Sequence, residues 1–263
     1  MGLQELLVVV AGFVGGFFST LASNGSSVTL PALGLLGLPE HVANGTNRLS
    51  VVALGLVGTV HFARLGLIDW REGVKVAVLI ALGTVAGSYA AVDLSNAALD
   101  AIVIGGLLVV LALLLSRPGR WLEGRGGEIT QFGPLQIFAY LAIGVYAGLV
   151  VLGSGFFMLA ALVLLTGYDL RRGNAMKAFV LLVVGLQSLV VFADKGDVDW
   201  SAGIPLALGS AAGAYVAARL ASSDRARVWV YRFLVLVVIL AIVQFLIVDT
   251  NEILGGRGPL SRY

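Results

Sequence analysis

The chain has 263 residues, of which 59% are hydrophobic and only 12% are charged. Soluble domains carry about 25% charged residues, so this composition excludes an ordinary soluble protein and indicates a polytopic membrane protein. The lack of cysteine excludes disulfides, thiolate metal sites and cysteine nucleophiles, and the net charge of +2 gives no reason to expect a nucleic-acid partner.

The apolar runs, taken in chain order, predict an all-helical fold. Two runs, 27–37 and 156–166, have about half the length needed to cross a bilayer. Short or broken helices are tolerated at membrane depth only where they are buried in protein or line a cavity, and in transporters they mark the binding site. The runs long enough to span are 3–22, 43–64, 72–92, 97–115, 135–152, 172–193, 200–220 and 228–248.

The sequence repeats itself. A shift of 130 residues superposes Asp69-Trp70 on Asp199-Trp200, and 9 of the 19 residues from 55 to 73 are identical to their partners. We interpret this similarity as an internal duplication. The predicted division is a first membrane repeat at 1–116, a cytoplasmic linker at 117–133, a second membrane repeat at 134–249 and an extracytoplasmic tail at 250–263.

Basic residues indicate that the two halves have opposite orientations. The loop at 65–71 follows Arg64 and contains Arg71, so we expect it on the cytoplasmic side. Most Lys and Arg residues face the cytoplasm only if the copy of this loop, at 195–201, lies on the opposite side. Each repeat would contain one re-entrant or broken hairpin and three spanning helices, as in inverted-repeat transporters. Both chain termini are then predicted to be extracytoplasmic.

Small polar residues gather at the tips of the two predicted hairpins. A helix that starts there would point its free N–H groups and the positive end of its dipole into the membrane. Two such ends meeting across a pseudo-two-fold axis would form a cradle for an anion. The alternative is that these residues only make tight turns and allow close packing. The candidate substrate-binding residues of the tips are Ser23, Asn24, Gly25, Ser26, Gly153, Ser154 and Gly155.

Polar residues also lie near the start of the long run that follows each short one. Arg48 and Lys177 occupy nearly equivalent places, because the same shift aligns Asn47 with Lys177. Charges inside a membrane are costly and usually face a cavity or a partner, which makes both cations candidate anion ligands. The alternatives are snorkelling to the headgroups or pairing with Glu40 or Asp169. The candidates in this group are Thr46, Asn47, Arg48, Asn174 and Lys177.

The sequence gives little support for proton transfer, catalysis or metal binding. His61, near a helix end, is expected to be an interfacial or packed residue, with a proton relay as the alternative. Trp121 and Trp229 lie close to basic residues and are expected to anchor the protein at the membrane interface. No catalytic set, metal-binding motif or phosphate loop is present, so we expect no enzyme activity, no cofactor and no metal site.

Motifs in both halves resemble the sulfite exporter TauE/SafE family over about residues 8–248. The resemblance implies an inner-membrane exporter of sulfur-containing anions, such as sulfite or sulfoacetate, built from two inverted halves. Family members often have a glycine-rich first tip, and this chain departs from that pattern at Asn24, Ser26 and Ser27. The motifs that carry the resemblance are 23–27, Pro31, 36–39, 43–47, Gly148, 153–155, 165–168, Asn174, Lys177, Phe192 and Asp199-Trp200.

We therefore predict a secondary transporter that exports a small sulfur-containing anion by alternating access. Its expected partners are the anion and the lipid bilayer, and the sequence leaves a homodimer open. One alternative is an anion channel that uses the same site. The other is a membrane-embedded enzyme or an accessory subunit of a larger complex.

Overall fold

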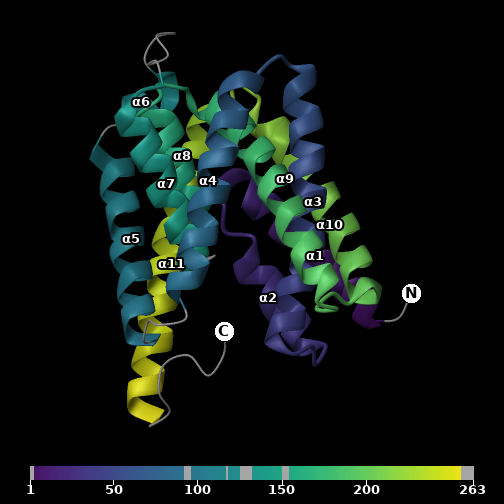
Figure 1. The fold of residues 1–263 in the computed structure, drawn as a ribbon. Helices are drawn as coiled ribbons and strands as arrows, with labels where there is room; N and C mark the ends of the chain where they lie inside the picture. The colour runs from purple at the N-terminus through teal and green to yellow at the C-terminus, as the bar shows by residue number, and fades with distance from the viewer. Residues whose placement is uncertain (1–2, 92–95, 117, 125–131, 150–153, 256–263) are drawn as a thin grey trace.

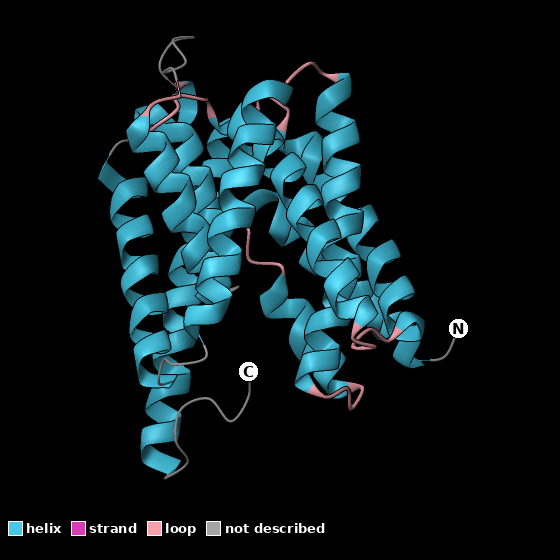
Figure 2. Ribbon diagram, viewed as in Figure 1, coloured by secondary structure: helices cyan, strands magenta, loops and turns pink. Residues whose placement is uncertain are grey.

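The computed structural model describes residues 3–91, 96–116, 118–124, 132–149 and 154–255. Within these ranges every regular element is an α-helix (Figure 2), so the predicted all-helical polytopic fold is confirmed. Three of the described helices, α1, α9 and α10, are long and apolar enough to cross a membrane. The helices are α1 (Leu3–Ala22), α2 (Ser26–Leu35), α3 (Glu40–Arg64), α4 (Trp70–Ala91), α5 (Asn96–Ser116), α6 (Pro118–Glu123), α7 (Pro134–Leu149), α8 (Ser154–Leu164), α9 (Leu170–Asp194), α10 (Trp200–Ala221) and α11 (Arg227–Gly255).

The two short helices are α2 and α8, which match the two half-length runs. At 10 and 11 residues they are about 15 and 17 Å long, roughly half the thickness of a ~30 Å hydrocarbon core. In Figure 1, α2 descends from the interior to the end of the molecule at which α1 begins. Each short helix therefore brings a helix N-terminus into the interior of the bundle.

The loops that follow the short helices lie at opposite ends of the molecule. The start of α3, just after α2, contacts the α9–α10 loop, because His41 Nε2 lies 3.7 Å from Asp197 Oδ1. The loop after α8 instead contacts the α3–α4 loop, where the Tyr168 hydroxyl donates to Asp69 Oδ2 at 3.4 Å. Since α3 runs from one end to the other (Figure 1), the two hairpins approach the interior from opposite sides.

Residues 130 positions apart make equivalent contacts. A Cβ added at Gly203 would meet the side chains of Leu49 and Thr46, and one added at Gly73 would meet those of Phe179 and Met176. All three pairs of positions differ by 130. At the level of whole helices, α1 packs chiefly against α10 and α4 against α7, while α3 packs about equally against α9 and α10. These paired contacts support the interpretation of an inverted duplication.

Glycines bring the backbones of α1 and α10 into direct contact. A Cβ added at Gly12 or Gly16 would overlap backbone atoms of Leu206 or Ser210. Small residues at helix interfaces permit this close approach, which replaces the hydrophobic driving force that is missing between helices in lipid. The α1 leg of the first hairpin is therefore fixed against a long helix of the second half.

The structure corrects the expectation for Trp121. This residue lies in α6, inside the segment predicted as a polar linker, and its side chain is fully buried in the main core. Its indole Nε1 donates to the Leu113 carbonyl at 3.3 Å, so the ring has a buried acceptor and does not anchor at the interface. At the other end of the second half, α11 continues to Gly255, into the segment predicted as a tail.

Candidate functional site

The tip of the first hairpin is a short turn between α1 and α2. Figure 2 shows this loop in the interior of the molecule, between its two ends. Ser23 has a φ of +57°, and holding a non-glycine residue in this left-handed region costs about 1–2 kcal/mol. Gly25 is the N-cap of α2 and makes no side-chain cap, so the first N–H groups of α2 are not capped by it. The strained tip thus presents backbone donors inside the bundle.

Asn47 of α3 holds the start of α2 in place. Its Nδ2 donates to Ser26 Oγ at 3.3 Å, and its Oδ1 accepts from Thr29 Oγ1 at 2.7 Å. The Asn47 side chain is buried, and Thr29 also contacts the Gly25 carbonyl. The predicted candidate Asn47 therefore lies at the first turn of α2, where it orients the helix N-terminus.

Lys177 connects the second half to the first. It lies about two turns into α9 and is only 1% exposed. Its Nζ donates to the carbonyl of Thr20 at 2.8 Å and to that of Ser19 at 3.2 Å. These carbonyls belong to the last turn of α1, where the helix dipole favours a cation. Lys177 thereby places a buried positive charge beside the first tip.

The two tips meet. A Cβ added at Gly155 would lie 2.5 Å from the Cβ of Ser23 and 2.7 Å from its Oγ. Since α8 begins at Ser154, its first turn lies against the end of α1. Gly153, the remaining predicted residue of the second tip, lies outside the described residues. The expected approach of the two hairpin tips is therefore present in the geometry of Ser23 and Gly155.

Several buried polar atoms near this junction have no protein partner within the described part of the chain. They include Ser23 Oγ and Thr20 Oγ1, which belong to the segment that Lys177 contacts, and Asn174 Oδ1 on α9. The side-chain Nδ2 of Asn174 donates to the Leu170 carbonyl at 3.0 Å. A buried polar group without a partner costs about 1–3 kcal/mol, so these atoms mark a place that a polar ligand or water can satisfy.

Arg48 has a different environment from Lys177. Its Nη2 donates to Asn44 Oδ1 at 2.9 Å on its own helix, and its guanidinium lies 5.5 Å from the centre of the Phe192 ring. The neighbouring Thr46 accepts from the backbone N–H of Asp199 at 2.9 Å. These contacts direct both side chains toward the α9–α10 end, and none of them is made with a tip residue.

His61 lies near the other end of α3. Its Nε2 is 3.1 Å from the hydroxyl of Ser222, just past α10, and its ring lies edge-on to those of Phe62 and Tyr215. None of these contacts involves the tips. The structure therefore places His61 in a packed position close to the end of α10, and its role as a proton relay stays a prediction.

Sequence reasoning missed three residues of this junction. Ser19 and Thr20 supply the carbonyls that receive Lys177, and Thr29 completes the network of Asn47. The signal was present for Thr29, because it lies three residues after Ser26 on the same face of a helix. The carbonyl acceptors have no side-chain signature, since every residue carries one. Among the described residues, no cluster of His, Asp or Glu is arranged to hold a metal ion.

Comparison with known proteins identifies a family and several relatives. The sequence profile of the family described as sulfite exporter TauE/SafE matches residues 8–245. A probable membrane transporter protein, ORF9, from Sinorhizobium sp. is 29% identical over 224 residues, which cover 83% of this chain and 84% of that protein.

Two further relatives have similar coverage. A probable membrane transporter protein from Haemophilus influenzae is 27% identical over 220 residues, covering 82% of this chain and 85% of the relative. The probable membrane transporter protein YfcA from Escherichia coli K12 is 26% identical over 228 residues, covering 84% and 82%. No solved structure gives a significant match. Because the family profile covers most of the chain, this protein belongs to the sulfite exporter TauE/SafE family of membrane transporters.

Proposed function

We propose that this transporter exports a small sulfur-containing anion, such as sulfite, sulfoacetate or a related organosulfonate, across the inner membrane. The observation that carries the proposal is the buried ammonium of Lys177 beside the junction of the two tips. A buried cation without a paired carboxylate is costly, and in membrane proteins such residues usually serve a substrate pathway. Its described bonds go to two backbone carbonyls, which are neutral.

The junction offers three kinds of anion ligand. Lysine carries three N–H donors, and two of those of Lys177 are directed to carbonyls, which leaves one for an anion. The hydroxyls of Ser23 and Thr20 have no partner within the described chain and can donate. The first turn of α8, at Ser154 and Gly155, adds backbone N–H groups and the positive end of a helix dipole.

The remaining predicted residues have supporting roles in this proposal. Asn24, Gly25, Ser26 and Asn47 shape the first tip, and Gly153 and Asn174 complete the second-half side. Arg48, Thr46 and His61 act from outside the junction, Arg48 through its long-range field.

Alternating access would follow from the inverted arrangement of the two hairpins. The membrane potential, negative inside, favours the exit of an anion by about 2.3 kcal/mol per charge per 100 mV. Export therefore requires no obligatory coupling to another ion. The positive-inside distribution of Lys and Arg supports extracytoplasmic termini.

The proposal can be tested with the purified full-length protein in liposomes. Counterflow of labelled sulfoacetate should be saturable and accelerated by sulfoacetate or sulfite on the opposite side, and acetate should compete poorly. Single-channel currents carried by the same anions would show a channel instead. Absence of any flux from the purified protein would contradict both and favour an accessory subunit.

A further inference from the structure

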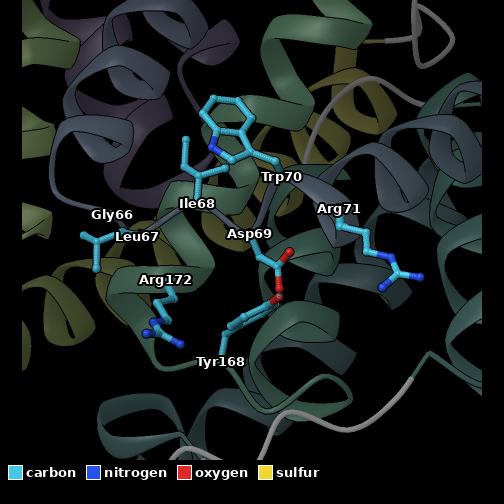
Figure 3. A pocket seen from close by; sticks show the side chains of 8 residues that line it. All are labelled: Gly66, Leu67, Ile68, Asp69, Trp70, Arg71, Tyr168 and Arg172. Carbon is cyan, nitrogen blue, oxygen red and sulfur yellow. Dashed lines mark hydrogen bonds between the residues drawn. The ribbon is translucent and has the colours of Figure 1, made fainter.

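A polar hollow lies at the end of the molecule where α3 turns into α4. It is an open depression of about 480 Å³ between the α3–α4 loop of the first half and the α8–α9 loop of the second half. Figure 3 shows its lining from close by. The hollow is separate from the tip junction, because none of the tip residues lines it. The lining residues are Gly66, Leu67, Ile68, Asp69, Trp70, Arg71, Tyr168 and Arg172.

Two arginines of this hollow have no charged or hydrogen-bonding partner for their guanidinium groups among the described residues. Arg71 comes from the first turn of α4 and Arg172 from the first turn of α9. In Figure 3 they lie on either side of the Asp69 and Tyr168 side chains. Two other basic residues nearby are paired: Lys75 with Glu72 at 2.7 Å and Arg171 with Asp224 at 2.9 Å.

The single carboxylate of the lining is already engaged. Asp69 Oδ1 accepts from the backbone N–H of Glu72 at 3.2 Å, a contact of the N-cap type, and Oδ2 accepts from the Tyr168 hydroxyl. Burial and the nearby Asp69 carboxylate raise the pKa of Tyr168, so the phenol stays protonated and keeps donating. With one carboxylate and two guanidinium groups, the lining carries a net positive charge.

This charge is specific to one end of the molecule. The 130-residue shift takes Arg71 to Ser201 and Arg172 to Val42, so the equivalent loops at the opposite end lack both arginines. The α3–α4 loop also exposes apolar side chains at this rim, since Trp70, which lines the hollow, is 51% exposed and Leu65, next to the lining residue Gly66, is 48% exposed. Exposed tryptophan next to basic residues is typical of the headgroup level of a membrane.

We propose that this hollow binds a phosphate group, and that its natural source is the headgroup of an anionic phospholipid. Guanidinium groups bind phosphate with paired, charge-assisted hydrogen bonds, and basic pockets between helices at the cytoplasmic face bind anionic lipid headgroups. The apolar rim favours a lipid over a free ion, because it offers a surface to the acyl chains. The bound headgroup would bridge the Asp69 loop of one half and the Tyr168 loop of the other.

The test compares the thermal stability of the full-length protein in detergent with added phosphatidylglycerol, phosphatidylcholine or inorganic phosphate. Phosphatidylglycerol should raise the Tm of the wild type in a saturable way, and phosphatidylcholine should not. In the double variant Arg71→Gln/Arg172→Gln the apparent affinity for phosphatidylglycerol should fall by at least about tenfold. Arg64→Gln is the matched control, because Arg64 is exposed at the end of α3 but does not line the hollow.

Each outcome decides the proposal. Loss of the phosphatidylglycerol effect in the double variant but not in Arg64→Gln supports a lipid site, provided that the Tm without lipid is unchanged. An equal, arginine-dependent effect of inorganic phosphate supports the phosphate site and assigns its ligand to a soluble source. A double variant that responds like the wild type, or a response to phosphatidylcholine equal to that to phosphatidylglycerol, overturns the proposal.

Discussion

Lys177 and Arg48 are two cations at almost the same place in the two halves, and their surroundings differ. Lys177 reaches across to the first hairpin and donates to the carbonyls of Ser19 and Thr20. Arg48 stays within its own region, on Asn44 and against the Phe192 ring. The difference arises from a single step in register. Asn47, not Arg48, is equivalent to Lys177, and Asn47 is the residue that contacts a hairpin.

This comparison shows how equivalent helix positions in the two halves contribute to the tip junction. Both halves place a polar side chain about two turns from the start of a long helix and direct it at the first hairpin. The first half uses an amide, which orients the start of α2, and the second half uses an ammonium, which caps the end of α1. The pair thereby defines a polar centre with one formal charge, and the Arg48 side chain is directed away from it, toward the α9–α10 end.

The change with the largest expected effect is Lys177→Gln. It removes the buried charge at the tip junction and with it the strongest attraction for an anion. A charge-assisted hydrogen bond contributes about 1.5–3 kcal/mol, so counterflow should fall by about 10- to 150-fold at fixed anion concentration. The measurement is initial counterflow in liposomes with equal protein content. Flux near the wild-type rate would show that Lys177 is structural.

Gly155→Ala tests the contact between the tips. The added Cβ would crowd Ser23, which must shift, and overpacking of this kind costs about 1–3 kcal/mol. We expect a lower Tm together with weaker anion binding. The matched control is Gly34→Ala in α2, because a Cβ at Gly34 meets nothing within 4 Å. Equal behaviour of the two variants would indicate that the tips do not depend on this contact.

Two substitutions of Asn47 separate the effect of its hydrogen bonds from the effect of charge at the tip. Asn47→Ala removes both contacts with α2 and should weaken anion binding by about tenfold. Asn47→Asp keeps an acceptor for Thr29 but adds a negative charge next to the tip, so binding should be weaker still. Titration of the purified variants with sulfoacetate gives the order. Better binding by the aspartate variant than by the alanine variant would contradict an anion site here.

Arg48→Gln should have the smallest effect of the series. The variant loses a cation–π contact worth about 0.5–1 kcal/mol and one hydrogen bond, both outside the tip junction. We therefore expect a small decrease in Tm and counterflow within about threefold of the wild type. A loss as large as that of Lys177→Gln would mean that Arg48 reaches the anion in another conformation of the transporter.

Much of the frame could be predicted from residue patterns. The short helices α2 and α8 follow from the lengths of their apolar runs, and the start of α2 follows from the small residues at 23–26. The register shared by Asn47 and Lys177 follows from the duplication. A close approach of the two tips was expected, because tips that carry glycine and serine can pack closely, and the structure shows this approach between Ser23 and Gly155.

The rest depends on features that leave no pattern in the sequence. The acceptors of Lys177 are backbone carbonyls, and which carbonyls it reaches depends on how far α1 extends beside α9. From the sequence, Arg48 and Lys177 were equivalent candidates, because both are cations near the start of a long helix. Neither property says in which direction around the helix the side chain points. Trp121 was misjudged for a similar reason, since proximity to basic residues says nothing about packing against α5 and α8.

The measurement that tests the central claim most directly is the affinity of the purified full-length protein for sulfite and sulfoacetate, determined by calorimetry for the wild type, Lys177→Gln and Arg48→Gln. An anion held at the tip junction predicts that Lys177→Gln loses measurable binding and keeps its fold, while Arg48→Gln binds nearly as well as the wild type. Undiminished binding in Lys177→Gln would contradict the account.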